Sequence, residues 1–177
     1  RHTTLKVGGP AQYWVEPITV ESFSKSLRFF DRLNIPVRVI GRGSNLLICD
    51  GGIQGAVIHP SGGEFSEVSV SGNYITAGVG ARFKKLNNIA KMHEISGFEW
   101  MEGIPGNVGG GLRMNAGAMG TETFDQVVSV KFLDSSGQIY EKSSHDVKSE
   151  YRSVPELNNN YAISAVFEGV SGNVRDI

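Results

Sequence analysis

The sequence predicts an α+β protein made of two lobes, and three observations support this prediction. Within the first sixty of its 177 residues, one helical pattern separates short apolar runs, as in an α/β unit. After the Ser-Gly-Gly sequence at residues 61–63, the pattern changes to strands paired through tight turns. Each half also contains one glycine-rich segment. We therefore expect lobe 1 to span residues 1–60 and lobe 2 to span residues 61–170.

Lobe 1 is expected to begin with a strand over residues 11–16. A helix follows it, with Thr19 as the N-cap, because a threonine hydroxyl can accept a hydrogen bond from a free amide of the first turn. Three apolar residues recur in this helix at the spacing of one helical face: Phe23, Leu27 and Phe30. Short strands are expected over residues 37–40 and 56–58, on either side of the first glycine-rich segment.

Lobe 2 is expected to contain two hairpins and a final strand. Residues 68–70 and 74–76 are predicted as paired strands because a Ser-Gly-Asn turn separates them. Residues 127–133 and 139–142 are predicted as a second pair around an Asp-Ser-Ser-Gly turn. The last strand is expected over residues 162–167.

A helix is predicted over residues 83–93, between the two hairpins. One side of it carries four residues at helical spacing: Leu86, Ile89, Ala90 and His93. We expect His93 to be a half-buried helix residue rather than a catalyst. Gly97 is the expected stop signal after this helix.

Two glycine-rich segments carry the functional signal. The first reads Gly-Arg-Gly-Ser-Asn-Leu-Leu at residues 41–47, and the second covers residues 103–111 and runs into Met-Asn-Ala-Gly-Ala at 114–118. Glycine lets backbone N–H groups approach a ligand and turn toward one point, which suits a phosphate or diphosphate. Ser44 and Asn45 would add side-chain donors. With one segment in each lobe, we expect the two to meet at a ligand that lies between the lobes and touches both. The alternative is that both segments are ordinary tight turns.

The kind of nucleotide is narrowed by two patterns that the sequence lacks. No Gly-x-x-x-x-Gly-Lys-Ser/Thr sequence is present, so the phosphate-loop lysine and the magnesium-binding hydroxyl are absent. No Gly-x-Gly-x-x-Gly opens a helix, as a Rossmann lobe requires. These absences argue against ATP and NAD as the ligand and favour another dinucleotide.

Composition excludes several partners. A formal net charge of −1 offers no concentrated basic face for nucleic acid or a charged membrane. No apolar run is long enough to cross a bilayer and no signal peptide begins the chain, so we expect a cytoplasmic protein. The single cysteine, Cys49, is expected to pack as a small apolar residue. The four histidines are dispersed, and we predict no metal.

The chain resembles a known family, the FAD-containing UDP-N-acetylenolpyruvoylglucosamine reductases of bacterial peptidoglycan synthesis. Five segments match in order: residues 2–10, 41–47, 103–106, 114–120 and 151–152. The resemblance implies the FAD-binding fold of the vanillyl-alcohol-oxidase (PCMH) type, with the flavin between two α+β lobes. It also implies which residues bind FAD. These are Gly41, Gly43, Ser44, Asn45, Leu46, Gly103, Ile104, Pro105, Gly106, Gly109, Asn115, Ala116 and Gly117.

The same resemblance implies an activity. Members take a hydride from NADPH onto FAD and reduce an enolpyruvyl UDP-sugar to UDP-N-acetylmuramate. Arg152 matches the catalytic arginine, since a guanidinium stays protonated and can stabilise an enolate. The family draws a proton-donating serine and a glutamate from a later domain. Because the chain begins at Arg1 and ends soon after the last strand, we expect an inactive piece in which residues 171–177 begin that domain.

Two other functions stay open. One is a different FAD oxidoreductase on the same scaffold, such as an alcohol or sugar-lactone oxidase, which often holds flavin covalently through histidine or cysteine. The other is a nucleotide-binding module without chemistry. The sequence does not reveal an oligomeric state.

Overall fold

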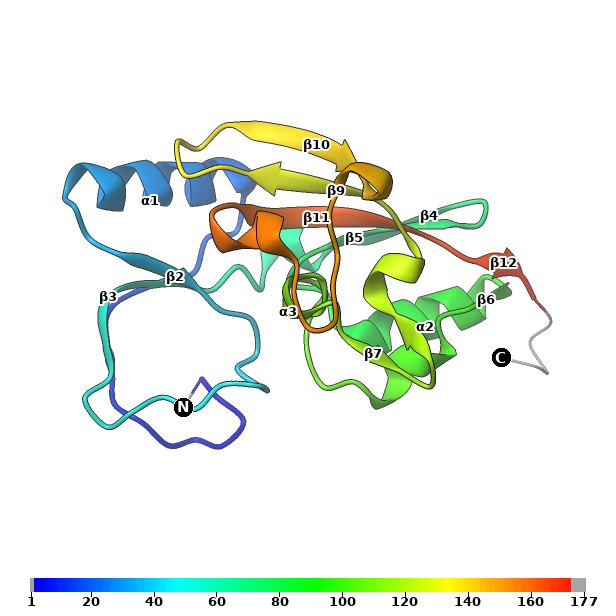
Figure 1. Ribbon diagram of the computed structural model, residues 1–177, viewed down its shortest axis with the longest axis horizontal. Coiled ribbons are helices and arrows are strands. Elements are labelled where there is room, and N and C mark those ends of the chain that lie inside the picture. Colours follow the sequence, from blue (N-terminus) through cyan, green and yellow to red (C-terminus); the bar gives the residue numbers. More distant parts are fainter. Residues whose placement is uncertain (1, 173–177) are drawn as a thin grey trace.

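The computed structural model describes residues 2–172, and two separate β-sheets organise them (Figure 1). The smaller sheet has three parallel strands in the spatial order β1-β3-β2. Its strands are β1 (Ala11–Val15), β2 (Val37–Val39) and β3 (Ile53–Ile58). Helix α1 (Val20–Arg32) connects β1 to β2. These elements confirm the strand and helix predictions for the first sixty residues.

The larger sheet has five antiparallel strands in the order β10-β9-β11-β5-β4. Its strands are β4 (Val68–Ser71), β5 (Tyr74–Gly78), β9 (Val127–Leu133), β10 (Ile139–Ser143) and β11 (Tyr161–Glu168). Both predicted hairpins and the predicted last strand are therefore confirmed. Two small antiparallel pairs complete the described strands: β6 (Ile95–Ser96) with β12 (Val170–Ser171), and β7 (Gly117–Ala118) with β8 (Thr121–Glu122).

Helix α1 begins at its predicted cap. The Thr19 side chain accepts a hydrogen bond from the Ser22 N–H at 3.1 Å, and the Ser22 hydroxyl returns one to the Thr19 carbonyl oxygen at 2.8 Å. The Thr19 N–H lies 3.2 Å from the same hydroxyl. These local bonds satisfy amides that an α-helix leaves free at its first turn.

Helix α1 packs against both sheets. The Phe23 ring lies 5.8 Å from Phe65 and 5.7 Å from Tyr161 at the start of β11. Farther along α1, the Phe30 ring lies 5.7 Å from Tyr13 of β1. The sheets therefore divide between residues 58 and 68. The main hydrophobic core includes Ile58 of β3 together with Phe23 and Leu27 of α1, whereas Phe30 is buried outside it. The predicted start of a further domain falls largely on residues 173–177, outside the described residues.

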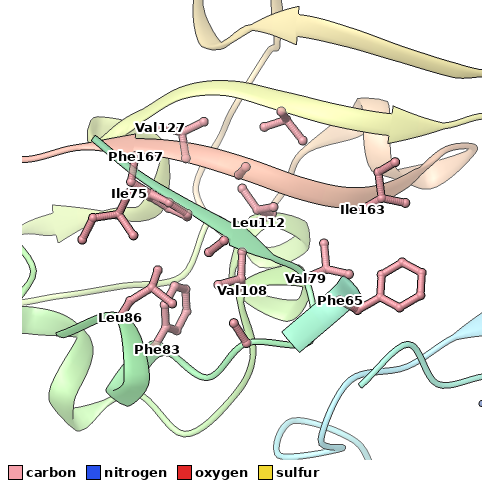
Figure 2. Packing of buried hydrophobic residues seen from close by; sticks show 14 of the residues in the cluster. Phe65, Ile75, Val79, Phe83, Leu86, Val108, Leu112, Val127, Ile163 and Phe167 are labelled. Carbon is pink, nitrogen blue, oxygen red and sulfur yellow. The ribbon is translucent and has the colours of Figure 1, made fainter. Parts of the chain in front are cut away.

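The centre of the core lies between the five-stranded sheet and two helices, α2 (Phe83–Met92) and α3 (Val108–Met114). Figure 2 shows Ile75 and Phe167 from neighbouring strands above Phe83 and Leu86 of α2. Leu112 of α3 lies just beneath the sheet (Figure 2). The sheet and the helices thus form two layers with aromatic and branched side chains between them.

Helix α2 ends earlier than predicted. Met92 is its last residue, and Glu94 takes the left-handed conformation, with φ of 56°. Gly97 lies beyond β6 and does not stop the helix. His93 is exposed rather than half-buried, because the chain leaves the helical path at this residue and turns its side chain to solvent. The expectations for His93 and Gly97 were therefore wrong.

The second glycine-rich segment contains helix α3, which the sequence did not predict. Glycine is among the poorest helix formers, so three consecutive glycines suggested a loop. Their packing explains two of them. A Cβ on Gly109 would lie 3.0 Å from Val79 Cβ, and one on Gly111 would overlap the Phe83 ring. These glycines allow α3 to approach β5 and α2 closely.

Candidate functional site

The two glycine-rich segments meet, as the sequence predicted. The Ser44 hydroxyl donates a hydrogen bond to the Pro105 carbonyl oxygen at 2.6 Å. The Arg42 N–H donates to Oδ1 of Asn107 at 3.1 Å. Residue 42 therefore faces residue 107 and residue 44 faces residue 105, so the segments run antiparallel with ties at alternate positions. We call residues 41–46 together with residues 103–107 the cradle.

Several backbone N–H groups of the cradle have no hydrogen-bond partner in the part of the chain that the structure describes. Among residues 2–172, no hydrogen-bond acceptor lies in range of the N–H groups of Gly43, Ser44, Asn45 and Gly106. Gly43 has φ of 64°, a left-handed conformation that glycine adopts at little cost. No acidic residue occurs in residues 41–47 or 103–111. An arrangement of free amides without nearby carboxylates suits an anionic ligand.

The first segment is held from below by the N-terminal residues. The Thr4 N–H donates to the Gly43 carbonyl oxygen at 3.1 Å. A Cβ on Gly43 would lie 2.7 Å from the His2 oxygen and 2.8 Å from Thr3 Cα. Gly43 is therefore required both by its backbone conformation and by the chain that passes across it.

Cys49 corrects a prediction. It is exposed rather than packed, and Leu47 just before it is 73% exposed. This stretch forms an irregular surface loop whose backbone, rather than its side chains, makes the contacts. The Cys49 carbonyl oxygen accepts hydrogen bonds from the N–H groups of Gly9 and Gly52, both at 2.9 Å.

Asn115 closes the other end of α3. Asn115 is the C-cap of the helix, and its backbone is left-handed, with φ of 37°. Its side chain is buried, since the residue is only 2% exposed. Its Nδ2 donates to Glu122 Oε2 at 2.7 Å, and its Oδ1 accepts the Phe124 N–H at 3.1 Å. The neighbouring Ala116 carbonyl oxygen accepts the Thr123 N–H at 2.9 Å. The polar groups of this corner are therefore engaged in holding its fold.

Arg152 is brought to this corner. It occupies a tight turn closed by hydrogen bonds between Glu150 and Ser153, and its φ is 57°. Its Nη1 donates to the Asn115 carbonyl oxygen at 3.3 Å, and its guanidinium carbon lies 5.0 Å from the Tyr151 ring centre. Within the described chain, Nε and Nη2 of Arg152 have no acceptor, so the exposed guanidinium keeps free donors.

The segment that carries Arg152 is anchored by Glu156. Oε1 of Glu156 accepts hydrogen bonds from the Tyr140 hydroxyl at 2.8 Å and from Nζ of Lys142 at 2.9 Å. The Lys142 ammonium lowers the pKa of Glu156 below its usual value. Burial, followed by the hydrogen bond to Glu156, raises the pKa of Tyr140. The turn before β11 is thereby fastened to β10.

The predicted site residues fall into two groups. One group lies in the cradle, where the two segments meet: Gly41, Gly43, Ser44, Asn45, Leu46, Gly103, Ile104, Pro105 and Gly106. Those at the far end of α3 lie by the guanidinium: Asn115, Ala116, Gly117 and Arg152. Gly109 lies between them inside α3, and its N–H donates to the Val79 carbonyl oxygen at 2.9 Å.

Sequence reasoning missed the side chain of Asn107. It is 3% exposed and joins the two segments, yet nothing in a single sequence distinguishes it from the other polar residues of a loop. A possible signal was its position as the one amide side chain within residues 103–111, where a buried polar group needs a partner.

A groove away from the cradle has a volume of about 750 Å³. It lies on the face of the five-stranded sheet that carries Thr76, Lys131 and Ser164. Antiparallel sheets commonly leave one such face in water. Residues 2–172 contain no group of three side chains able to hold a metal ion. None of their helices combines the length and apolar character of a membrane span.

Comparison with known proteins supports the site. Residues 11–143 match the model of a family described as FAD binding domain. The chain is 40% identical over 178 residues to a UDP-N-acetylenolpyruvoylglucosamine reductase of Clostridioides difficile, covering 100% of this chain and 58% of that protein. It therefore spans less than two thirds of this curated relative. The predicted resemblance to these reductases is confirmed.

Solved structures agree on the fold. The structure of UDP-N-acetylenolpyruvylglucosamine reductase (MurB) from Thermus caldophilus superposes with a TM-score of 0.83 at 30% identity, over 99% of this chain and 61% of that one. Phl p 4, a grass pollen allergen with glucose dehydrogenase activity, superposes with a TM-score of 0.69 at 17% identity, over 94% and 36%. Both comparisons fit the predicted vanillyl-alcohol-oxidase type of fold, and the chain belongs to the FAD binding domain family.

Proposed function

We propose that this chain is the FAD-binding part of an NADPH-dependent reductase that converts UDP-N-acetylglucosamine enolpyruvate to UDP-N-acetylmuramate in the cytoplasm. The observation that carries the proposal is the meeting of the two glycine-rich segments at Ser44 and Pro105, 2.6 Å apart. Two segments sixty residues apart combine there into one surface of free amides. The relatives of the chain that bear this reductase name support the substrate.

The cradle would hold the diphosphate of FAD. Its free N–H groups are all donors, and an anion is the ligand that donors alone can satisfy. The fit is supported by Gly106, which is partly exposed and whose added Cβ would meet only the Ser44 hydroxyl, at 3.5 Å. Leu46, which is the last residue of the first cradle segment and is 37% exposed, would offer the ligand an apolar contact. Asn115, Ala116 and Gly117 would line the opposite end of the same ligand.

Arg152 would act at that opposite end. Helix α3 has seven residues and spans about 10 Å, so the guanidinium lies roughly that far from the cradle. Bound FAD would supply hydride transfer. Arg152 would stabilise the negative charge that develops on the enolpyruvyl group, because its free Nε and Nη2 form a planar pair of donors. The contact with Asn115 would hold the guanidinium in place.

The remaining chemistry would come from outside this chain. Since the chain covers 58% of its reductase relative, a proton donor to the reduced carbon would lie in the rest of the protein. Ser153 and Glu156 do not fill that role. Ser153 closes the Arg152 turn through its backbone, and Glu156 is already bound to Tyr140 and Lys142.

The test is a comparison of flavin nucleotides. FAD, FMN and ADP are titrated into the chain, and binding is followed by quenching of flavin fluorescence or, for ADP, by calorimetry. A diphosphate cradle predicts FAD binding at least 10-fold tighter than FMN, which has no diphosphate. Equal affinities, or no FAD binding by a chain whose circular dichroism shows it folded, would refute the cofactor assignment.

A second measurement addresses the reaction. The full-length protein is assayed for NADPH oxidation that depends on the enolpyruvyl UDP-sugar. Replacement Arg152→Ala is expected to abolish substrate-dependent oxidation while FAD stays bound. Yellow colour that remained on acid-precipitated protein would instead favour a covalent flavin oxidase.

A further inference from the structure

We infer that the side-chain amide of Asn107 is the positioning group that holds the two glycine-rich segments together as one cradle before any ligand binds. The inference rests on the proposed function, because it concerns the same site. Asn107 touches no reacting group and would act through the backbone that it holds. Nothing in the glycine pattern assigns it this role.

The Asn107 amide uses both of its ends on backbone groups. Its Oδ1 accepts the Arg42 N–H at 3.1 Å, and its Nδ2 donates to the Gly80 carbonyl oxygen at 3.1 Å. Gly80 is itself fixed, since its N–H donates to the Phe65 carbonyl oxygen at 2.7 Å. A planar amide bound at both ends has one orientation. The peptide of Arg42 is thereby tied to the turn after β5, which is itself bonded to the backbone of the buried core residue Phe65.

The surroundings of Asn107 indicate that this contact is built rather than incidental. A Cβ on Gly41 would lie 3.2 Å from Asn107 Oδ1, closer than nearly all such contacts. Gly41 therefore leaves room for the amide. A residue larger than glycine at position 41 would therefore push against the Asn107 amide, whereas Gly43 is favoured by its left-handed backbone.

Of the two bonds that join the segments, the one between Ser44 and Pro105 is the weaker. Ser44 donates to Pro105 at a more exposed position, where water can replace the bond. The bond from Asn107 Nδ2 to the Gly80 carbonyl oxygen is buried, so removing the amide would leave that carbonyl oxygen without a partner away from water. Leaving a buried polar group unpaired costs more than losing an exposed bond. Asn107 should therefore dominate the positioning of the cradle.

The experiment compares Asn107→Ala with the unaltered chain by two readouts. One is the dissociation constant for FAD from fluorescence quenching. The other is hydrogen exchange of the peptide covering residues 41–47 without ligand. We expect the dissociation constant to rise at least 10-fold and the peptide to exchange faster. Val130→Ala is the control, because it destabilises the buried core of β9 without touching the cradle.

A second variant covers the case in which Asn107→Ala does not fold. Gly41→Ala keeps Asn107 and adds one methyl group against its amide, so it should also raise the FAD dissociation constant and the exchange rate. FAD affinity unchanged in both variants would overturn the inference and leave the proposed function intact. Weaker binding with unchanged exchange would also overturn it, since that pattern means direct ligand contact.

The two proposals fail in different ways. If the unaltered chain does not bind FAD, the proposed function fails. Hydrogen exchange alone then decides the role of Asn107. Faster exchange confined to residues 41–47 in Asn107→Ala would support the tie, and unchanged exchange would refute it.

Discussion

At the scale of single residues, Arg152 adopts a backbone conformation that does not suit an arginine. Its φ of 57° is in the left-handed region, which costs a residue with a Cβ about 1 kcal/mol relative to glycine. The Arg152 side chain is exposed, so packing does not explain why arginine occurs there. Backbone strain of this kind is found at functional sites, but it does not identify one by itself, because Lys6, Glu94 and Met119 have φ of 56° as well.

The strain can be measured with two variants that both lack the guanidinium. Arg152→Gly should be more stable than Arg152→Ala by about 0.5–1 kcal/mol, because glycine accepts the left-handed conformation and alanine does not. Urea denaturation followed by circular dichroism gives the difference. Equal stabilities would mean that the turn relaxes at no cost and that residue 152 is not strained.

The residues of the site were predictable in kind but not in role. The pattern of glycines identified both segments and their meeting, because glycine permits close backbone approach wherever it occurs. It did not separate Gly43, which serves the cradle, from Gly111, which makes room for the Phe83 ring. That distinction depends on neighbours far away in sequence. The same reason hid Asn107, whose partners Arg42 and Gly80 are backbone groups.

At the scale of elements, α3 offers a matched pair of glycines. Gly110→Ala should raise the free energy of unfolding by about 0.5–1 kcal/mol, since nothing lies within 4 Å of its new Cβ and alanine is the better helix former. Gly111→Ala should lower it by about 1–3 kcal/mol, because the methyl group would overlap the Phe83 ring. Chemical denaturation of both variants tests the packing of α3. If the two shift in the same direction, α3 does not lie as described.

The anchor at Glu156 predicts a dependence on pH. The hydrogen bond from Lys142 lowers the folded-state pKa of Glu156 below the 4.5 that is usual for glutamate. A carboxyl group whose pKa is lowered on folding stabilises the protein above its unfolded pKa, and this contribution is lost as the pH falls through the folded value. Glu156→Gln should therefore lower the free energy of unfolding by about 1 kcal/mol at pH 7, a value already reduced for partial exposure to solvent. The difference between the two proteins should shrink as the pH falls below about 4.5.

Thermal unfolding at a series of pH values from 7 to 3 checks this prediction. The control is Glu21→Gln, since Glu21 pairs with Lys25 on the open surface of α1, where ion pairs contribute little. A deficit of Glu156→Gln that stays constant down to pH 3 would contradict an ionic anchor. It would point to loss of packing instead.

At the scale of the whole molecule, the order of elements was predictable and their arrangement was not. Helical and strand periodicity identified α1, both hairpins and β11, because those signals are local. The strand order β10-β9-β11-β5-β4 depends on pairing between residues far apart in sequence. The division near residue 60 describes the two sheets, yet α1 packs Phe23 against the larger sheet and Phe30 against the smaller one. The residues that join the smaller sheet to the main core are Ile58 of β3 and Phe23 and Leu27 of α1.

A shared core predicts that both sheets unfold together. The sequence contains two tryptophans, and the structure puts Trp14 in β1 and buried Trp100 beside the Phe83 ring. Trp100→Phe leaves Trp14 as the reporter of the smaller sheet, and Trp14→Phe leaves Trp100 as the reporter of the larger one. Within each variant, the fluorescence midpoint in urea should coincide with the midpoint from circular dichroism, so any change in overall stability cancels. Adding Phe23→Ala should lower both midpoints together, by an amount that reflects about 3–5 kcal/mol, because it removes a buried ring by which α1 packs on the larger sheet. A Trp14 transition that precedes the circular dichroism transition would show that the smaller sheet unfolds alone, and that α1 does not unite the two.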